Sequence, residues 1–147
     1  ASPRIRFDLS VNHFTRDLAL NRDLVIFGAD SWRPYCHVED ISRALAEIEI
    51  IGPHRLGHRV YNVGSNAQNY TKRDLIELIR TQIKGGRIAF QDNSSHDPRN
   101  YRVDFTRIRQ ELSFVPDLSI RDGVREVLKL VGSGLLTDYD SIRYRYA

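Results

Sequence analysis

The chain has 147 residues, of which 41% are hydrophobic and 28% are charged. This composition is typical of a globular protein, and the length suits one domain with a sizeable core. The net charge of +3 is mildly basic, and the basic residues are spread without the dense run of a nucleic-acid-binding arm. No apolar run reaches membrane-spanning length, and no signal-peptide pattern occurs. The single cysteine, Cys36, excludes an internal disulfide and a cysteine-based zinc site, so we expect a cytoplasmic protein without nucleic-acid or membrane partners.

Hydrophobic periodicity predicts alternating helices and strands. Phe7, Val11, Phe14 and Leu18 recur at the spacing of an amphipathic helix. By contrast, the compact apolar run 24–27, which a glycine ends, is typical of a short buried strand. The predicted elements, in chain order, are a helix over 7–20, strands over 24–27 and 35–38, a helix over 38–50, a strand over 60–64, a helix over 72–83, a strand over 87–90, extended chain over 101–104, and helices over 107–112 and 120–130. This alternation predicts an α/β fold in which some strands are parallel.

Three hydroxyl residues are placed to start helices from the middle of the chain onwards. Thr71, Thr106 and Ser119 each precede an apolar-periodic segment, as an N-cap residue does. Asp74 and Asp122 follow two of them by three residues, which is the spacing of a capping box. The sequence therefore predicts well-defined starts for these helices.

The common catalytic and metal-binding motifs do not occur in this sequence. The five histidines are scattered, with no HxH or HExxH arrangement, and there is no GxSxG, GxGxxG or P-loop motif. Two arginines on loops remain as candidates for phosphate binding. Arg33 is held between Trp32 and Pro34, and Arg99 lies in the polar stretch 91–100. A rigidly presented arginine can clamp a phosphate with two hydrogen bonds, and the alternative is a surface salt bridge.

Segments along most of the chain follow one another in an order and spacing that match a known family. They are SPRIRFDLSVNHF, LVIFG, WRPYCHVEDISRA, VYNVGS, TKRDLIELI, and DPRNYRVDFTRIRQELSFVP followed by SIRDGVREVL. Together they resemble the NAD-dependent nucleotide-sugar epimerases and dehydratases of the extended short-chain dehydrogenase/reductase family. The resemblance extends to about Val131.

This resemblance implies the C-terminal portion of a Rossmann-type enzyme with a small mixed α/β substrate subdomain. Residues 1–131 would form the substrate-binding region, with a few Rossmann-sheet elements near 38–64, and 132–147 would be a tail. The family keeps its glycine-rich cofactor loop and its Tyr-x-x-x-Lys catalytic pair upstream of these segments, and neither motif occurs here. We therefore expect a fragment that has no catalytic residues and no metal site and binds no cofactor alone. NAD or NADP would belong to the complete enzyme.

Five positions near the start of the chain take their expected roles from the resemblance. Arg33 matches the arginine that grips the substrate diphosphate. Asn12 matches a helix asparagine that contacts phosphate or the neighbouring sugar. Val25, Ile26 and Phe27 match the strand that lies along the nucleotide base. These residues are expected to contribute to a substrate site.

The later part of the expected site departs from the family pattern at one place. Asp97 and Tyr101 match positions near the ribose and the diphosphate. Many relatives carry a further phosphate-binding arginine shortly before this aspartate, where this chain has Ser94 and Ser95. Arg99 is the expected substitute, as in relatives with a D-x-R-x-Y arrangement.

The resemblance implies a function in binding a nucleoside-diphosphate sugar. Joined to a missing N-terminal Rossmann half, the chain would position that sugar for an NAD(P)-dependent enzyme, and epimerases, dehydratases and reductases share these residues. A stand-alone module that binds a nucleotide sugar or a protein without catalysis is the alternative. A remnant of a truncated gene is another alternative. The oligomeric state stays open, with a homodimer of the complete enzyme as one arrangement.

Overall fold

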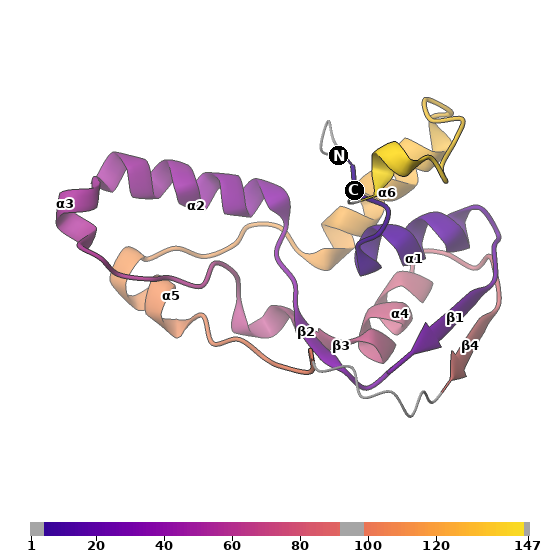
Figure 1. The fold of residues 1–147 in the computed structure, drawn as a ribbon, viewed down its shortest axis with the longest axis horizontal. Coiled ribbons are helices and arrows are strands. Elements are labelled where there is room, and N and C mark those ends of the chain that lie inside the picture. Colours follow the sequence, from indigo (N-terminus) through magenta and orange to yellow (C-terminus); the bar gives the residue numbers. More distant parts are fainter. Residues whose placement is uncertain (1–4, 92–98, 146–147) are drawn as a thin grey trace.

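The computed structural model describes residues 5–91 and 99–145, which form a mixed α/β arrangement (Figure 1). The helices are α1 (Ser10–Ala19), α2 (Val38–Ile51), α3 (Pro53–Leu56), α4 (Lys72–Arg80), α5 (Thr106–Leu112) and α6 (Ile120–Gly132). The strands are β1 (Leu24–Phe27), β2 (Trp32–Pro34), β3 (Asn69–Thr71) and β4 (Ile88–Gln91), and 3-10 turns cover Asn66–Gln68 and Ile142–Tyr144. The predicted α/β class is confirmed. Within the described ranges, no helix is long and apolar enough to cross a membrane.

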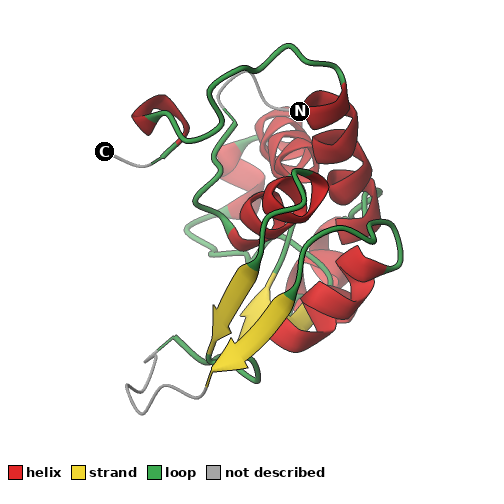
Figure 2. Ribbon diagram, turned by 90° about the vertical axis from the view of Figure 1, so that its right-hand side faces the viewer, coloured by secondary structure: helices red, strands yellow, loops and turns green. Residues whose placement is uncertain are grey.

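The largest hydrophobic core lies where α1, α4 and α6 meet beside the β1–β4 pair (Figures 1 and 2). Leu18 of α1, Leu75 of α4 and Val124 of α6 are each 0% exposed at its centre. Leu24 and Ile26 add the inner face of β1. Burying a large aliphatic side chain contributes about 1.5–3 kcal/mol. This cluster therefore provides most of the driving force that holds the three helices together.

A second, smaller core lies under α2, which extends away from the first core together with α3 and α5 (Figure 1). Ala44 of α2 packs there with the aromatic rings of Phe105 and Phe114. Gly64 is required at its edge because an added Cβ would lie 2.6 Å from the Phe105 ring, and its φ of +154° is also unfavourable for other residues. The chain after α3 is thereby held against α5.

The C-terminal segment packs back onto the residues before α1. The Phe7 ring lies 5.5 Å from the ring of Tyr144 and 6.1 Å from that of Tyr139, measured between centroids. The Phe7 N–H also donates a hydrogen bond of 2.8 Å to the Tyr144 carbonyl. This use of Phe7 explains why α1 begins at Ser10 and not at the predicted position 7.

The strands form two separate pairs. β1 and β4 are parallel, with Leu24 opposite Ile88 and Phe27 opposite Gln91. β2 and β3 are antiparallel, with Arg33 opposite Tyr70. The prediction that some strands are parallel is confirmed. The strand β3 was not predicted, since its sequence Asn-Tyr-Thr is polar and short.

Two predicted strands are wrong. The one predicted over 35–38 lies earlier, at Trp32–Pro34, because His37 serves as the N-cap of α2 and the helix has already begun at Val38. No strand forms over 60–64 in this chain. A strand needs a neighbour to accept its backbone hydrogen bonds, and Tyr61 and Val63 instead pack against the core under α2.

The predicted helix starts are correct in two of three places. Both capping boxes are present, at Thr71 with Asp74 and at Ser119 with Asp122. The prediction of Thr106 as a cap is wrong, since α5 already begins at this residue. The Asp104 carboxylate caps the helix instead by accepting a 2.6 Å hydrogen bond from the Thr106 N–H. A carboxylate before the first turn also interacts favourably with the helix dipole.

Asp17 holds a buried ion-pair cluster on α1. Its carboxylate lies 2.6 Å from Arg16 Nε, 3.0 Å from His13 Nε2 and 3.6 Å from Arg22 Nη1. Burial opposes ionisation of this carboxyl, but the hydrogen bonds from His13 and Arg16 outweigh it and lower its pKa to about 2. The cluster joins α1 to the turn that leads into β1.

Replacing Asp17 with Asn should lower the free energy of unfolding at pH 7 by about 3 kcal/mol, because the buried Arg16 loses its nearest counter-ion and keeps only Asp140 at 4.0 Å. The pKa of Asp17 is depressed in the folded state, so its contribution is full above about pH 4 and is lost as the pH falls towards 2. Denaturant unfolding of both proteins between pH 7 and 2 measures this. Asp23→Asn, which removes an exposed pair with Arg87, is the control and should change little. A variant as stable as the wild type at pH 7 would contradict the assignment.

Candidate functional site

A cleft of about 460 Å³ lies between the chain before α1, strand β2 with the residues after it, and the first half of α6. Its walls are largely apolar, including Leu9, Tyr35 and Ile120. The polar side chains at its walls are those of Arg6, Ser10, Asn12, Arg33, His37, Gln68, Ser119 and Glu126. An apolar cleft with a few convergent polar groups is the usual form of a small-molecule site. This cleft is therefore the candidate functional site.

Arg33 is fixed at one side of the cleft by strand β2. The strand pairs with β3, where Arg33 lies opposite Tyr70. The Arg33 guanidinium donates a 2.7 Å hydrogen bond from Nη1 to the Trp32 carbonyl, and its Cζ lies 5.7 Å from the centre of the Tyr101 ring. These contacts hold the side chain in one orientation, which lowers the entropic cost of gripping an anion.

Residues 99–103 are laid along the outside of β2. The Trp32 N–H donates to Asn100 Oδ1 at 2.9 Å, and the Tyr101 N–H donates to the Trp32 carbonyl at 3.3 Å. The Arg102 guanidinium stacks on the Trp32 ring at 3.3 Å. The structure thereby brings Tyr101 to Arg33, as expected for two residues of one site. Arg99 is exposed and does not line the cleft, and Asp97 lies outside the described residues.

Asn12 lines the cleft from α1. Its side-chain amide donates a 2.9 Å hydrogen bond to the Arg6 carbonyl. The amide thus holds the chain before α1 against the helix. The structure therefore brings Asn12 and Arg33 to the same cleft from segments 21 residues apart.

The expected base-binding strand lies outside this cleft. Val25 and Phe27 are 48% and 45% exposed on the outer face of β1, while Ile26 is buried in the core behind them. Ile26 therefore takes part in packing and is unavailable to a ligand. Phe90 of β4, 42% exposed, adds a second aromatic ring and lies 4.5 Å from the Arg73 guanidinium. An exposed apolar surface of this kind can receive an aromatic ring.

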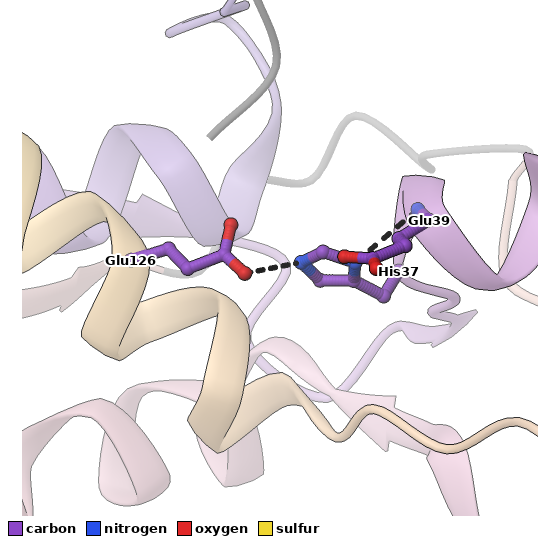
Figure 3. Close-up of side chains that lie close together, drawn as sticks. All are labelled: His37, Glu39 and Glu126. Carbon is purple, nitrogen blue, oxygen red and sulfur yellow. Dashed lines mark hydrogen bonds and ion pairs between the residues drawn. The ribbon is translucent and has the colours of Figure 1, made fainter.

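Among the cleft residues that were not predicted from the sequence, His37 and Glu126 form a pair. His37 Nδ1 accepts a 3.3 Å hydrogen bond from the Glu39 N–H, and His37 Nε2 lies 3.4 Å from a Glu126 carboxylate oxygen (Figure 3). The position of His37 before the acidic start of α2 is a sequence signal for a helix cap. Nothing in the sequence connects it to Glu126, which α6 brings in from 89 positions away.

The ligand atoms of His37, Glu39 and Glu126 all lie within 4.8 Å of one another, which raises the question of a metal. The hydrogen bond from the Glu39 N–H occupies the Nδ1 lone pair. In a neutral imidazole the proton is then on Nε2, directed at Glu126. This tautomer leaves no nitrogen lone pair for a metal, so the geometry describes a hydrogen-bonded His–Glu pair.

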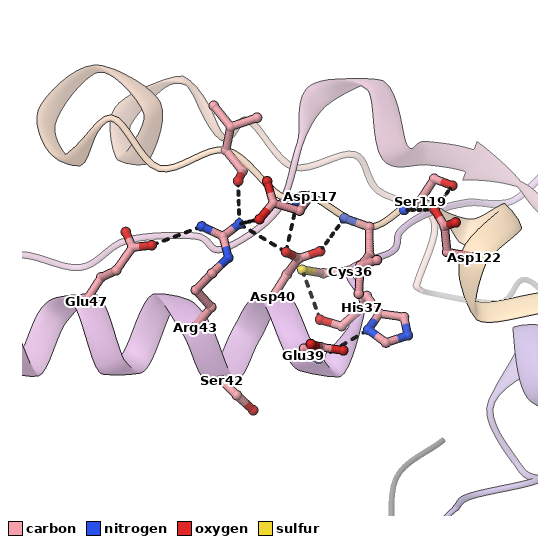
Figure 4. Close-up of polar contacts among 12 residues, drawn as sticks. Cys36, His37, Glu39, Asp40, Ser42, Arg43, Glu47, Asp117, Ser119 and Asp122 are labelled. Atoms are coloured by element: carbon pink, nitrogen blue, oxygen red, sulfur yellow. Dashed lines mark hydrogen bonds and ion pairs between the residues drawn. The ribbon is translucent and has the colours of Figure 1, made fainter. Parts of the chain in front are cut away.

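Asp40 is a buried residue of α2 that links this helix to the segment before α6, next to the cleft (Figure 4). It is 1% exposed, and its two carboxylate oxygens accept hydrogen bonds of 2.9 and 3.0 Å from the backbone N–H groups of Asp117 and Leu118. Arg43 Nη2 lies 3.1 Å from the same carboxylate and also donates to the Val115 carbonyl. Asp40 therefore fixes the segment that leads into α6.

The comparisons with known proteins give relatives by sequence and by structure, while no protein-family model matches. A dTDP-glucose 4,6-dehydratase from Streptomyces griseus is 35% identical over 95 residues, which are 63% of this chain and 27% of that protein. UDP-glucuronic acid decarboxylase 1 from Arabidopsis thaliana is 24% identical over 119 residues, which are 78% of this chain and 26% of that protein. The chain thus spans about a quarter of the length of these relatives.

The structural matches cover nearly all of the chain. The UDP-glucuronic acid 4-epimerase of Bacillus cereus, in complex with UDP-glucuronic acid and NAD, has a TM-score of 0.72 at 18% identity, over 90% of this chain and 42% of that one. The structure of RMD from Pseudomonas aeruginosa, complexed with NADPH, has a TM-score of 0.69 at 23% identity, over 88% of this chain and 44% of that one.

The fold matches part of the extended short-chain dehydrogenase/reductase fold. The extent of the match fits a C-terminal portion of these enzymes. Together with the sequence relatives, these matches show that the chain is similar to NAD-dependent sugar dehydratases and epimerases. The resemblance stated from the sequence is confirmed. β1 ends at Phe27, and the turn after it leads into strand β2, so this strand is not followed by the glycine-rich turn and helix that receive a pyrophosphate.

Replacing Asp40 with Asn should lower the free energy of unfolding by about 2–4 kcal/mol, because an amide offers only one acceptor oxygen to the two backbone N–H groups. Denaturant unfolding at pH 7 measures this. Asp117→Asn is the control, since the Asp117 side chain is 74% exposed although it lies 3.3 Å from the same arginine. Equal losses in the two variants would contradict a special role for Asp40.

Cys36 should react slowly with thiol reagents in the native protein. Burial is the larger cause, and the charge of Asp40 the second, that raises the pKa of the Cys36 thiol from 9.0 to about 11. The thiolate fraction at neutral pH therefore falls about a hundredfold. The native rate should therefore keep rising about tenfold per pH unit above pH 9, whereas the rate in denaturant levels off. Modification rates from pH 7.5 to 10 measure this, and a native rate that levels off near pH 9 would contradict it.

Proposed function

We propose that this chain binds a nucleoside-diphosphate sugar as the substrate-binding part of an NAD(P)-dependent sugar epimerase or dehydratase. The observation that carries the proposal is the placement of Arg33. It lines an apolar cleft on one side and contacts Tyr101 on the other, and its guanidinium is held by the Trp32 carbonyl. Arginine in such a setting suits the bidentate recognition of a diphosphate.

The other residues of the proposed site would contact the nucleotide base, the ribose and the sugar of the ligand. The exposed outer face of β1, with Val25 and Phe27, would receive the nucleotide base, and Tyr101 would lie at the ribose and diphosphate. Asn12 would contact phosphate or sugar from the cleft side. Asp97 and Arg99 complete the set expected from the sequence, and their contribution stays a prediction.

An apolar face of α2 supports the proposal that this chain works together with an N-terminal Rossmann half. Val38, Ile41 and Leu45 are 54%, 39% and 62% exposed, and they follow one another at helical spacing on the side of α2 away from its own core. Val38 also lines the cleft. An N-terminal Rossmann half seated on this face would complete the cleft and supply the cofactor site. The domain division at about residue 131, a homodimer of the complete enzyme and a cytoplasmic location stay predictions from the sequence.

Catalysis by the chain alone is not part of the proposal. The sequence contains no Tyr-x-x-x-Lys pair and no glycine-rich cofactor loop. The alternative function is a stand-alone module that binds a nucleotide sugar or a protein partner without chemistry. The exposed apolar face of α2 favours the first proposal, because a stand-alone module has no need of such a face.

Calorimetric titration of the chain with UDP-, dTDP- and GDP-sugars tests the proposal. We expect weak binding of at least one of them, because part of the cleft wall is missing. Arg33→Ala should weaken that binding by about tenfold or more, through loss of a charge-assisted contact to phosphate.

Arg87→Ala is the matched control. Its guanidinium is 91% exposed, pairs with Asp23 and lies outside the cleft, so the affinity should not change. Tight binding that survives Arg33→Ala would overturn the proposed site and favour the stand-alone module. No binding of any nucleotide sugar would overturn the proposed function.

A further inference from the structure

The segment 133–145, which follows α6, folds back onto the chain before α1 (Figure 1). It contains the 3-10 turn Ile142–Tyr144, and the Tyr144 carbonyl accepts a 2.8 Å hydrogen bond from the Phe7 N–H. The Tyr144 ring meets the Phe7 ring nearly edge to face, at an interplanar angle of 73°, and the Tyr139 ring adds a second contact. A backbone hydrogen bond and two aromatic contacts therefore join the segment to the chain before α1.

A third apolar cluster joins the same segment to the wall of the cleft. Its buried members are Ile5, Phe7 and Val127. Ile5 and Val127 also line the cleft, so the cleft wall and this cluster share side chains. The residues packed against the cluster are Leu130, Val131, Leu136, Tyr139 and Tyr144. No described residue of the segment lines the cleft itself, so the segment supports the wall without being part of it.

Two arginines fasten the segment to α1 and to the turn after it. Arg16 Nη1 donates a 3.1 Å hydrogen bond to the Tyr139 carbonyl, and the Arg16 guanidinium lies 5.1 Å from the centre of the Phe7 ring. Arg22 Nη1 donates a 3.0 Å hydrogen bond to the Asp140 carboxylate. Charge-assisted hydrogen bonds thus add to the apolar contacts and fix where the segment lies.

The wall that this segment supports is irregular chain. Residues 5–9 precede α1 and belong to no helix or strand. Asn12 holds the Arg6 carbonyl from α1, and Tyr144 holds the N–H of the next residue, Phe7. Chain without regular backbone pairing opens easily, so the position of this wall depends on such tertiary contacts.

We infer that the segment 133–145 positions one wall of the cleft, and that Tyr144 is its main positioning residue. The segment thereby contributes to ligand binding without touching the ligand, a consequence that rests on the proposed function. Removing the Tyr144 ring releases Ile5 and Phe7, and a wall that must be ordered again on binding lowers the affinity. Because such coupling is reciprocal, a ligand in the cleft in turn holds the wall and the segment more firmly.

Amide hydrogen exchange followed by NMR tests the positioning without any ligand. Tyr144→Ala should speed exchange of the Phe7 amide about tenfold or more, because the segment that supplies its acceptor is loosened. The amide of Ile79 in α4, whose side chain is 0% exposed in the largest core, should exchange at nearly its wild-type rate. A local effect of this kind separates positioning from a general loss of stability.

Two further variants serve as controls. Tyr144→Phe keeps the ring against Phe7 and should restore wild-type exchange. Ile142→Ala removes a large apolar side chain from the same 3-10 turn, but that side chain is 77% exposed. It should therefore leave the exchange of the Phe7 amide unchanged.

Calorimetric titration with UDP-glucose, dTDP-glucose and GDP-glucose measures the consequence for binding. Tyr144→Ala should weaken the binding of whichever of them the wild-type chain binds by about three- to tenfold. Tyr144→Phe and Ile142→Ala should bind as the wild type does. The same ligand at saturation should slow exchange of the Phe7 amide in the wild type.

The two proposals fail in different ways. Unchanged exchange at Phe7 in Tyr144→Ala, or an equal rise at Phe7 and Ile79, overturns the positioning role. Faster exchange at Phe7 with unchanged affinity overturns the contribution to binding, while the nucleotide site at Arg33 stands. If the wild-type chain binds none of the nucleotide sugars, the proposed function is overturned together with that contribution, and the exchange rates alone decide the positioning role.

Discussion

One buried carboxylate holds the cleft together. Asp40 lies at the start of α2, and its two oxygens accept the N–H groups of Asp117 and Leu118, just before α6. Strand β2, which carries Arg33, lies just before α2 in the chain, while α6 carries Glu126. A charged group this deeply buried is stable only with such partners. The position of Arg33 relative to the opposite wall is therefore set by these hydrogen bonds.

The two cores of the chain explain how separate segments meet at this cleft. The first core joins α1, α4 and α6, so that Asn12 and Glu126 come from helices packed on one another. The second core lies under α2 and is made by α5 with the chain around it. The cleft opens between the start of α1, the chain from β2 into α2, and α6. Its residues thus depend on long-range packing and not on any one motif.

The chain spans only part of its relatives, and its surface is consistent with that. The outer faces of α2 and β1 are apolar and exposed, although their inner faces are well packed. The segment 60–64 has a sequence suited to a sheet but no neighbour for its backbone hydrogen bonds, so Tyr61 and Val63 pack against the core under α2 and no strand forms.

The sequence by itself determined much of the local structure and the resemblance to known enzymes. Apolar spacing predicted every helix from α4 onwards to within a few residues, and the two capping boxes are formed by the predicted pairs, because these signals act within one turn of chain. The ordered segments around Arg33 predicted the similarity to sugar dehydratases and epimerases that the relatives show. The tertiary structure alone decided which residues share the cleft. Val25 and Phe27 proved to lie outside it, and the His37–Glu126 pair was unforeseen, because the packing of α6 against the start of α2 brings together side chains that no sequence spacing connects.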